Sequence, residues 1–278
     1  MILDGKLVAN EIGNKLKEEI LARPDVRPPH LVIISVGDDP ASKVYVKNKM
    51  KKAEELGIEV THRVFPTTAS QRHLRWEIEI LNDNVDIDGI MVQLPLPAHL
   101  NEREIIDTIY PEKDVDGLTT TNIGKLRSGQ PCIKPCTAAG VMDLLDYYDI
   151  GVCGKNVTII GRSNIVGKPL ADLMMNAGAT VIQCHSKTRY IENLIEPANI
   201  VVSAIGKPKF FNAEPFYADQ IIVDVGINRD ENGKLCGDVN FDDLAPFCEA
   251  ITPVPGGVGP MTVIELMKNT VECWRKNI

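Results

Sequence analysis

A short apolar run followed by two spaced glycines constrains the fold of this chain more than any other stretch. Residues Val157 to Ile160 are apolar or β-branched, which predicts a buried parallel strand. Gly161 ends that run, and Gly167 opens a pattern of apolar residues with helical spacing. A glycine turn between a strand and a helix directs free backbone N–H groups and the positive helix end at one point. The stretch therefore predicts a phosphate site, and the alternative is a tight strand-to-helix turn without a ligand.

The glycine spacing departs from the common dinucleotide fingerprint. Ser163 stands where the second glycine would be, so we expect a wider loop. The next predicted strand, 179–184, ends without the Asp or Glu that would hold the ribose hydroxyl of NAD. Arg162, Ser186 and Lys187 supply cationic and hydroxyl groups instead, which suit a 2′-phosphate. We therefore expect NADP rather than NAD; the alternative is that the two cations are merely solvated.

Composition and charge limit the class of protein. The 278 residues suffice for one large or two medium domains, and 44% hydrophobic with 24% charged residues is ordinary for a soluble globular chain. A formal net charge of −8 argues against nucleic acid as a partner. Since no apolar run approaches the ~18 residues of a membrane span and the N-terminus lacks a signal-peptide pattern, we expect no membrane partner. Seven scattered cysteines favour reduced thiols in the cytoplasm and predict no metal site.

Strand and helix patterns alternate in both halves of the chain, which indicates two parallel α/β layers. Between them, residues 111–137 are rich in Pro, Gly, Asp and Thr and lack strong periodicity, so we place a domain boundary there. The stretch 252–260 is too rich in glycine and proline for either element, and its glycines allow a ligand to approach the backbone closely. The predicted strands are 30–36, 58–65, 89–93, 157–160, 179–184, 200–205 and 220–225, and the predicted helices include 6–21, 41–56, 71–81 and 261–274. Asn232-Gly233 predicts a hairpin.

Several side chains in the first half are candidates for chemistry. Tyr45 and Lys49 share one face of a predicted helix, and a lysine in a cleft loses its proton easily because desolvation disfavours its charged form. The same helix carries other lysines, so a solvated face is the alternative. Gln93 ends a buried strand at the edge where parallel sheets bind ligands. Either Asp114 or Asp116 could accept hydrogen bonds from a heterocycle or belong to a turn.

Together these motifs resemble the methylenetetrahydrofolate dehydrogenase/methenyltetrahydrofolate cyclohydrolase family. The resemblance covers nearly the whole chain, and its motifs stand in the family's order. They are Tyr45–Lys49, Val92–Leu96, Lys113–Gly117, Gly161–Gly167, His185–Thr188, Asp224–Asn228 and Thr252–Thr262. One departure is Ala138, where the family often has proline, which should affect a helix start and not the chemistry.

The resemblance implies a role for each candidate residue. Lys49 would be the acid/base of the cyclohydrolase step, and Gln93 would hold and tune it. Tyr45 would pack on the folate ring system, and Asp116 would bind the pterin. Further residues implied to contact the folate are Val92, Leu94, Pro255, Gly256, Gly257, Val258 and Gly259. Those implied to contact NADP are Gly161, Arg162, Ser163, Gly167, Ser186 and Ile227.

The resemblance also implies an activity and a domain plan. The family oxidises 5,10-methylenetetrahydrofolate with NADP and hydrolyses the 5,10-methenyl product to 10-formyltetrahydrofolate, in one-carbon metabolism and purine biosynthesis. The implied fold class is α/β with two α/β domains: 1–118 plus 254–278 bind folate, and 119–253 form a Rossmann-type NADP domain. The last helix returns to the first domain, and members are usually homodimers. The alternatives are a shikimate-type two-domain NADP dehydrogenase and a non-catalytic nucleotide-sensing scaffold.

Overall fold

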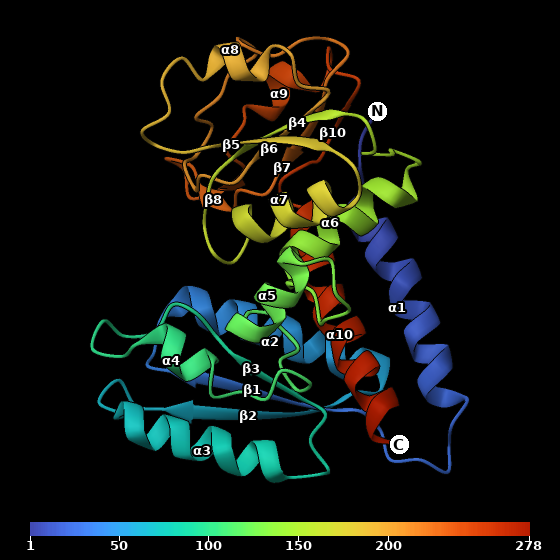
Figure 1. The fold of residues 1–278 in the computed structure, drawn as a ribbon, viewed down its shortest axis with the longest axis vertical. Helices are drawn as coiled ribbons and strands as arrows, with labels where there is room; N and C mark the ends of the chain where they lie inside the picture. The colour runs from blue at the N-terminus through green and yellow to red at the C-terminus, as the bar shows by residue number, and fades with distance from the viewer. The chain divides into compact units, whose positions relative to one another are not determined.

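The computed structural model describes residues 1–278 apart from the side chain of Ala41. The chain forms two compact units, whose elements Figure 1 labels. The β1 unit contains Glu11–Cys136 and Val263–Ile278, and the β4 unit contains Met1–Asn10 and Thr137–Thr262. These units divide the chain at residues other than those of the expected domains, 1–118 plus 254–278 and 119–253, so the functional domain ranges stay a prediction.

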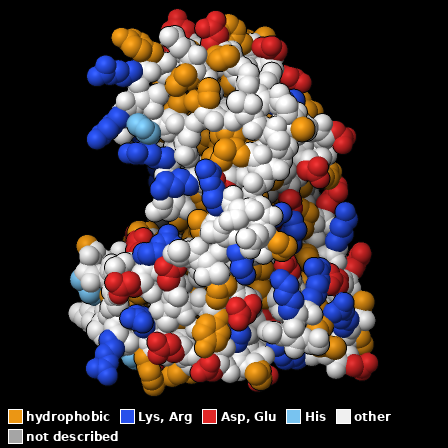
Figure 2. Space-filling view, viewed as in Figure 1, with side chains coloured by type: hydrophobic (Ala, Val, Ile, Leu, Met, Phe, Trp, Pro, Cys, Tyr) orange, Lys and Arg blue, Asp and Glu red, His pale blue; other side chains and the backbone are white. Residues whose placement is uncertain are grey.

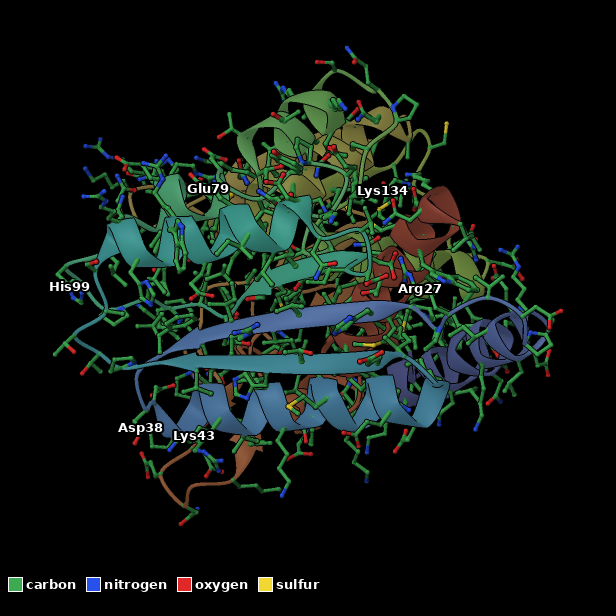
Figure 3. All side chains as sticks on the ribbon, turned by 90° about the horizontal axis from the view of Figure 1, so that it is seen from below. Arg27, Asp38, Lys43, Glu79, His99 and Lys134 are labelled. Atoms are coloured by element: carbon green, nitrogen blue, oxygen red, sulfur yellow. The ribbon has the colours of Figure 1, made fainter. Side chains whose placement is uncertain are left out.

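The β1 unit is built on a parallel sheet of order β2-β1-β3. Its strands are β1 (His30–Val36), β2 (Glu59–Phe65) and β3 (Gly89–Val92), and His30 pairs with Glu59 while Leu31 pairs with Gly89. The predicted strands are confirmed, except that β3 ends one residue before Gln93. The helices α2 (Pro40–Leu56) and α3 (Gln71–Asp83) lie on opposite faces of the sheet (Figure 3), because the right-handed crossovers from β1 to β2 and from β2 to β3 run across the sheet in opposite directions.

Both faces of the central strand are covered, which explains its unbroken apolar run. Val32 and Ile34 belong to one buried cluster with Leu74 and Ile78 of α3. Leu31 and Ile33 alternate with them and are also fully buried. At the start of α2, Asp39 caps the helix by accepting a hydrogen bond from Ser42 N at 2.7 Å. Asp38 and Lys43 form an exposed ion pair of 2.8 Å in the same turn (Figure 3).

Two short helices of the β1 unit were not predicted. They are α4 (Glu102–Ile106) and α5 (Thr120–Arg127). The stretch 111–137, which lacks strong periodicity in the sequence, thus contains the helix α5. That helix is too short to show a clear apolar period, and it depends on local capping, since Thr119 Oγ1 accepts from Asn122 N at 3.3 Å.

The β4 unit contains a five-stranded parallel sheet of order β10-β7-β6-β4-β5. The chain runs from β4 outward to β5 and then crosses back to β6, so the strand order reverses between β4 and β6. In open α/β sheets, ligands bind outside the carboxyl ends of the strands at such a reversal. The strands are β4 (Asn156–Ile160), β5 (Thr180–Cys184), β6 (Ile200–Ser203), β7 (Ile221–Asp224) and β10 (Ala250–Ile251).

The predicted hairpin at Asn232-Gly233 is confirmed, since β8 (Asn228–Arg229) pairs antiparallel with β9 (Leu235–Cys236). Gly233 has φ 75°, which the turn requires. The remaining helices are α1 (Gly5–Leu21), α6 (Cys136–Tyr147), α7 (Gly167–Asn176), α8 (Glu192–Ile195) and α9 (Phe241–Leu244). Among the described residues, none of the helices has both the length and the apolar character needed to span a membrane.

The last helix, α10 (Val258–Asn277), begins earlier than predicted. The expectation that 252–260 forms neither element is wrong for its last three residues. Pro260 lies in the first turn, where a backbone N–H has no intrahelical partner, so the ring is tolerated there. The end of α10 returns to the β1 unit as expected: Trp274 Nε1 donates to Arg27 O at 2.9 Å.

A buried carboxylate ties this end of α10 to the sheet. Asp88 is fully buried just before β3, and its oxygens accept from Arg27 at 2.6 and 2.8 Å. They also accept from His30 N at 2.9 Å and from Asn277 Nδ2 at 3.0 Å. One side chain thus joins β1, β3 and α10, and Arg27 is labelled at this position in Figure 3.

We expect Asp88→Ala to lower the free energy of unfolding by about 3 kcal/mol, because it leaves the Arg27 guanidinium without its partner. Urea denaturation measures this change. Asp86→Ala is the matched control, since Asp86 lies 3.8 Å from the same arginine but is 74% exposed. The control should lose at most about 0.5 kcal/mol. Equal losses in the two variants would contradict the anchoring role of Asp88.

Candidate active site

Lys49 turns from α2 toward the end of β3. Its Nζ donates to Gln93 Oε1 at 3.1 Å and lies 3.4 Å from Met91 Sδ. Gln93 Nε2 donates to Leu94 O at 2.7 Å, which directs Oε1 at the lysine. Met91 lies in β3 and Gln93 directly follows the strand, and both side chains contact Lys49 of α2. The structure therefore brings Lys49 and Gln93 together.

The other lysines of α2 differ from Lys49. Lys43 and Lys51 have side chains 60% and 75% exposed, and both lie near carboxylates on the surface. The alternative that the lysines of this helix lie on a solvated face holds for Lys43 and Lys51, whereas Lys49 is half-buried. Burial lowers the pKa of Lys49, although the charge of Asp116 acts in the opposite direction. A larger fraction of Lys49 is therefore in the neutral amine form, which can accept a proton, than for an exposed lysine.

Asp116 is the carboxylate that faces Lys49. Burial raises the pKa of Asp116, while the charge of Lys49 partly offsets this shift. Asp114 has a different role, because its oxygens accept from Leu118 N at 3.2 Å and Thr119 N at 2.8 Å. The sequence left open which aspartate is the turn residue, and the structure assigns the turn to Asp114. Gly117 completes it with φ 69°, and a Cβ there would lie 2.5 Å from the backbone of residue 134.

Three neighbours of this group escaped sequence reasoning: Met91, Cys136 and Asn269. Asn269, on α10, donates through Nδ2 to Val115 O at 2.9 Å and to Lys134 O at 3.0 Å, and it reaches Cys136 Sγ at 3.5 Å. Burial raises the pKa of Cys136 well above the usual thiol value, so the thiol stays neutral. Cysteine spacing was considered only for metal binding, and no cluster of metal ligands occurs among the described residues. A polar residue within the apolar stripe of α10 was the available signal for Asn269.

The remaining expected folate contacts lie in both units. Tyr45 precedes Lys49 by one helical turn and is 38% exposed. Val92 is buried at the end of β3, and Leu94 is half-buried beside it. Pro255–Gly259 belongs to the β4 unit and leads into α10.

The glycines of 252–260 serve different purposes. A Cβ on Gly257 would lie 2.7 Å from both Pro253 O and Thr252 Cβ, so this glycine is required by its own loop. The expectation that it leaves room for a ligand is therefore wrong. A Cβ on Gly259 would meet Ile227 Cδ1 at an ordinary 3.7 Å. Gly259 and Ile227, expected to contact folate and NADP respectively, are thus neighbours within the β4 unit.

The expected phosphate turn lies at the strand-order reversal. Gly161 has φ 139°, and a Cβ there would lie 2.4 Å from Ala204 O, at the end of β6. A Cβ on Gly167 would lie 2.2 Å from Gly161 O. Ser163 Oγ accepts weakly from Val166 N at 3.2 Å and Gly167 N at 3.4 Å. The expectation of free N–H groups at the start of α7 is therefore wrong for these two amides, because the serine hydroxyl already satisfies them.

Cationic and hydroxyl groups remain exposed around this turn. Arg162, Ser186 and Lys187 are exposed, and β5 ends at Cys184 without an acidic residue. His185 N donates to Thr188 Oγ1 at 2.9 Å, which shapes the turn that carries Ser186 and Lys187. Figure 2 shows Lys and Arg side chains gathered along one edge of the β4 unit. These groups suit a phosphate monoester better than a free ribose hydroxyl.

Comparison with known proteins gives one consistent result. Residues 3–116 match the family model "Tetrahydrofolate dehydrogenase/cyclohydrolase, catalytic domain", and residues 135–278 match its "NAD(P)-binding domain". The "Bifunctional protein FolD" of Campylobacter curvus is 48% identical over 271 residues, covering 97% of this chain and 94% of the relative.

Solved structures agree over the same length. The bifunctional enzyme FolD-methylenetetrahydrofolate dehydrogenase/cyclohydrolase of Campylobacter jejuni superposes with a TM-score of 0.97 at 42% identity, covering 100% of this chain and 99% of that one. The N5,N10-methylenetetrahydrofolate dehydrogenase-cyclohydrolase of Trypanosoma brucei, complexed with NADP cofactor and inhibitor, gives 0.94 at 38% identity, covering 99% and 97%.

The effect of the uncharged Gln93 side chain on the pKa of Lys49 can be tested directly. We expect Gln93→Glu to raise the pKa of Lys49, because a carboxylate favours the ammonium form. NMR titration of isotopically methylated lysines measures it. Gln130→Glu adds the same charge at an exposed position of the same unit and should leave the Lys49 titration in place. An unchanged Lys49 titration in Gln93→Glu would show that the contact does not control the amine.

Proposed function

This chain belongs to the tetrahydrofolate dehydrogenase/cyclohydrolase family, and from that membership we infer that it is a bifunctional enzyme. It oxidises 5,10-methylenetetrahydrofolate with NADP and hydrolyses the 5,10-methenyl product to 10-formyltetrahydrofolate, as a step of one-carbon metabolism. The observation that carries this conclusion is the contact between Lys49 Nζ and Gln93 Oε1. It supplies a proton carrier beside the carboxyl end of a parallel sheet, where a substrate binds.

The alternatives considered from the sequence have less support. Family membership favours folate chemistry over a shikimate-type dehydrogenase. A scaffold that only senses nucleotides would not need a half-buried lysine held against a glutamine at the end of a strand. Turnover of methylenetetrahydrofolate, followed separately at the NADPH and methenyl absorbance bands, tests the function. A protein that binds NADP but turns over neither folate would contradict it.

The residues around the glycine turn fit NADP. The turn from Gly161 to Gly167 lies at the reversal between β4 and β6, and cationic and hydroxyl groups stand exposed beside it. We propose that Arg162 and Ser186 hold the 2′-phosphate, and that Ser163 and Ile227 also contact the cofactor. When bound, NADP supplies the hydride acceptor. The residues of the chain bind and orient it.

The oxidation step needs alignment more than proton transfer. The methylene carbon lies between two nitrogens, and the positive charge that forms is delocalised over both. No side chain has to remove a proton at that carbon, so positioning supplies most of the catalysis. We propose that Tyr45 packs on the folate ring system and that Asp116 binds the pterin. Val92, Leu94 and residues 255–259 would line the remainder of the folate site.

The hydrolysis step does need a proton carrier. Water adds to the methenyl carbon, and we propose that the neutral amine of Lys49 takes the proton that water loses. The bond from this carbon to N5 then breaks, N5 takes up a proton, and the formyl group stays on N10. Gln93 keeps the amine in place through its Oε1, and it is neutral, so it does not stabilise the ammonium as a carboxylate would. The lowered pKa of Lys49, which burial causes, raises the share of amine able to act.

Lys49→Met should separate the two activities. The variant keeps an unbranched stem and removes the proton carrier, so cyclohydrolase activity should fall by at least about a hundredfold. Dehydrogenase activity should fall less, and methenyl product should accumulate while NADPH still forms. Lys47→Met, at an exposed position of α2, is the matched control and should retain both activities.

Two outcomes would contradict this assignment. Equal loss of both activities, with folate and NADP still bound, would mean that Lys49 also serves the hydride step. Retained cyclohydrolase activity would mean that another group moves the proton.

Ser186→Asp should weaken the preference for NADP over NAD. The added carboxylate repels a 2′-phosphate and can accept a hydrogen bond from a free ribose hydroxyl, so the preference should fall by about tenfold or more, ~1.4 kcal/mol. Steady-state kinetics with each cofactor measures the ratio. Ser70→Asp adds the same charge at the N-cap of α3, where aspartate also caps, and should not change the ratio. An unchanged ratio in Ser186→Asp would remove Ser186 from the phosphate site.

We also propose a cellular setting for this activity. The chain would form a homodimer paired through its cofactor domains, act in the cytoplasm, and supply 10-formyltetrahydrofolate to purine biosynthesis. The support is the resemblance of its motifs to a family whose members usually pair in this way. Light scattering during size-exclusion chromatography tests the dimer.

A further inference from the structure

Two carboxylates of the β4 unit are buried close together, one at the end of β7 and the other shortly after β9. Asp224 is the last residue of β7 and is 2% exposed. Asp238 follows β9 and is fully buried. Burying a charged group is costly unless its oxygens are satisfied, so their hydrogen bonds show what they hold in place.

Asp238 binds two separate segments through four donors. Its Oδ2 accepts from Ser203 Oγ at 3.1 Å and from Ile205 N at 2.7 Å. Its Oδ1 accepts from Lys207 N at 3.0 Å and from Asn228 Nδ2 at 2.9 Å. The carboxylate therefore fixes the backbone that leaves β6 and the first residue of β8.

Asp224 holds Asp238 in position. Its Oδ1 accepts from Gly226 N at 2.9 Å and Asp238 N at 3.0 Å, and its Oδ2 accepts from Val239 N at 2.9 Å. Burial raises the pKa of Asp224 to about 7, and the charge of Asp238 acts in the same direction.

The backbone around these carboxylates has no spare room. A Cβ on Gly226 would lie 2.2 Å from Asp238 Oδ1, and one on Gly237 would lie 1.8 Å from Asp224 Oδ2. Both carboxylates thus press directly against glycine backbone. A shift of either side chain would move the segment that it contacts.

One of the two segments held by Asp238 packs on the glycine turn, and the other contains Ile227, for which we proposed a contact with NADP. Residues 204–207 leave β6, and Ala204 O packs against Gly161 so closely that a Cβ there would lie 2.4 Å away. Ile227 lies between Gly226, which packs on Asp238, and Asn228, which donates to it. The reversal between β4 and β6 is where a dinucleotide binds in such a sheet.

We propose that Asp238 is a positioning residue for the oxidation step: by holding 204–207 beside the strand-order reversal and the backbone around Ile227 after β7, it sets the shape of the NADP crevice. This inference rests on the proposed function, because it assumes that the crevice takes NADP. Asp238 itself lies beneath the backbone that it orders and acts through those two segments.

A carboxylate is required at position 238, and an amide of equal size cannot replace it. All four partners of Asp238 are donors. Asn would turn an NH₂ group toward one pair of them, and because each pair contains a backbone N–H, which can only donate, at least that amide would lose its acceptor. Asp238→Asn therefore keeps the side-chain volume and weakens the hydrogen bonding that holds the two segments.

The hydrolysis step offers an internal control. It needs no hydride transfer, and its proposed proton carrier, Lys49, belongs to the β1 unit. Loosening the NADP crevice should therefore spare hydrolysis of methenyltetrahydrofolate supplied directly as substrate. A general folding defect would lower both activities together.

The test compares Asp238→Asn with Asp230→Asn in the full-length protein. Asp230 accepts from Asn232 N and Lys234 N, both at 2.9 Å, so the control changes the turn of the same hairpin. We expect Asp238→Asn to raise the Kd for NADP, measured by calorimetry on cofactor-free protein, at least tenfold. The KM for NADP should rise with it, while hydrolysis of methenyltetrahydrofolate stays within about twofold of the wild type. Asp230→Asn should leave all three values unchanged.

Ser203→Ala is the milder variant if Asp238→Asn does not fold. It removes one donor to Asp238 and leaves the amides in place, so the Kd for NADP should rise about threefold with hydrolysis unchanged. Unchanged NADP binding in a folded variant, or equal loss of NADP binding and hydrolysis, would overturn the inference. Failure of the wild type to bind NADP would instead contradict the proposed function.

Discussion

Reversal of strand order in each parallel sheet decides where functional groups can gather in this chain. In the β1 unit the chain leaves β1 for β2 and returns to β3 on the other side, and in the β4 unit it leaves β4 for β5 and returns to β6. No connection covers the carboxyl ends of the two strands at a reversal, so polar groups there face a ligand. Gln93 follows β3 at one reversal, and Gly161 follows β4 at the other, packed against the residue that follows β6.

Burial separates the buried ionisable groups of the two units into two kinds. Asp88 and Asp238 are fully buried, and each accepts hydrogen bonds from several donors, so burial of the charge is compensated and the side chain serves as an anchor. Lys49 meets the amide oxygen of Gln93 and the thioether of Met91, which are weaker partners for an ammonium than carboxylates. Its nearby carboxylate, Asp116, is itself shifted toward the neutral form by burial, so desolvation outweighs the attraction between the two. The incomplete compensation at Lys49 is what makes it suitable for proton transfer.

The sequence predicted those parts of the fold that repeat a simple period. The strands of both sheets and the long helices alternate with apolar spacing, and the motifs that carry the family resemblance are local in sequence. The sequence did not predict the role of a residue where that role depends on backbone from another segment of the chain. Gly257 looked free for a ligand, yet Thr252 and Pro253 occupy the space beside it. Asn269 and Cys136 are far apart in the chain and meet only because α10 returns to the β1 unit. The helix α5 depends on a cap at Thr119 and has no clear apolar period.

In the mechanism that we propose, the two activities depend on different kinds of constraint. Hydride transfer would depend on backbone held in shape, and the groups that hold this backbone, Asp224 and Asp238, accept from backbone amides, a hydroxyl and a side-chain amide. Hydrolysis would depend on the amine of Lys49, whose pKa burial lowers, and its partner Gln93 follows the strand next to β1. A change in packing around Asp238 can alter hydride transfer without altering the pKa of Lys49. A single change of charge near Lys49 can alter hydrolysis without moving the backbone around Asp238. A family with this division can therefore alter one activity by substitutions in the β4 unit while the chemistry at Lys49 is preserved.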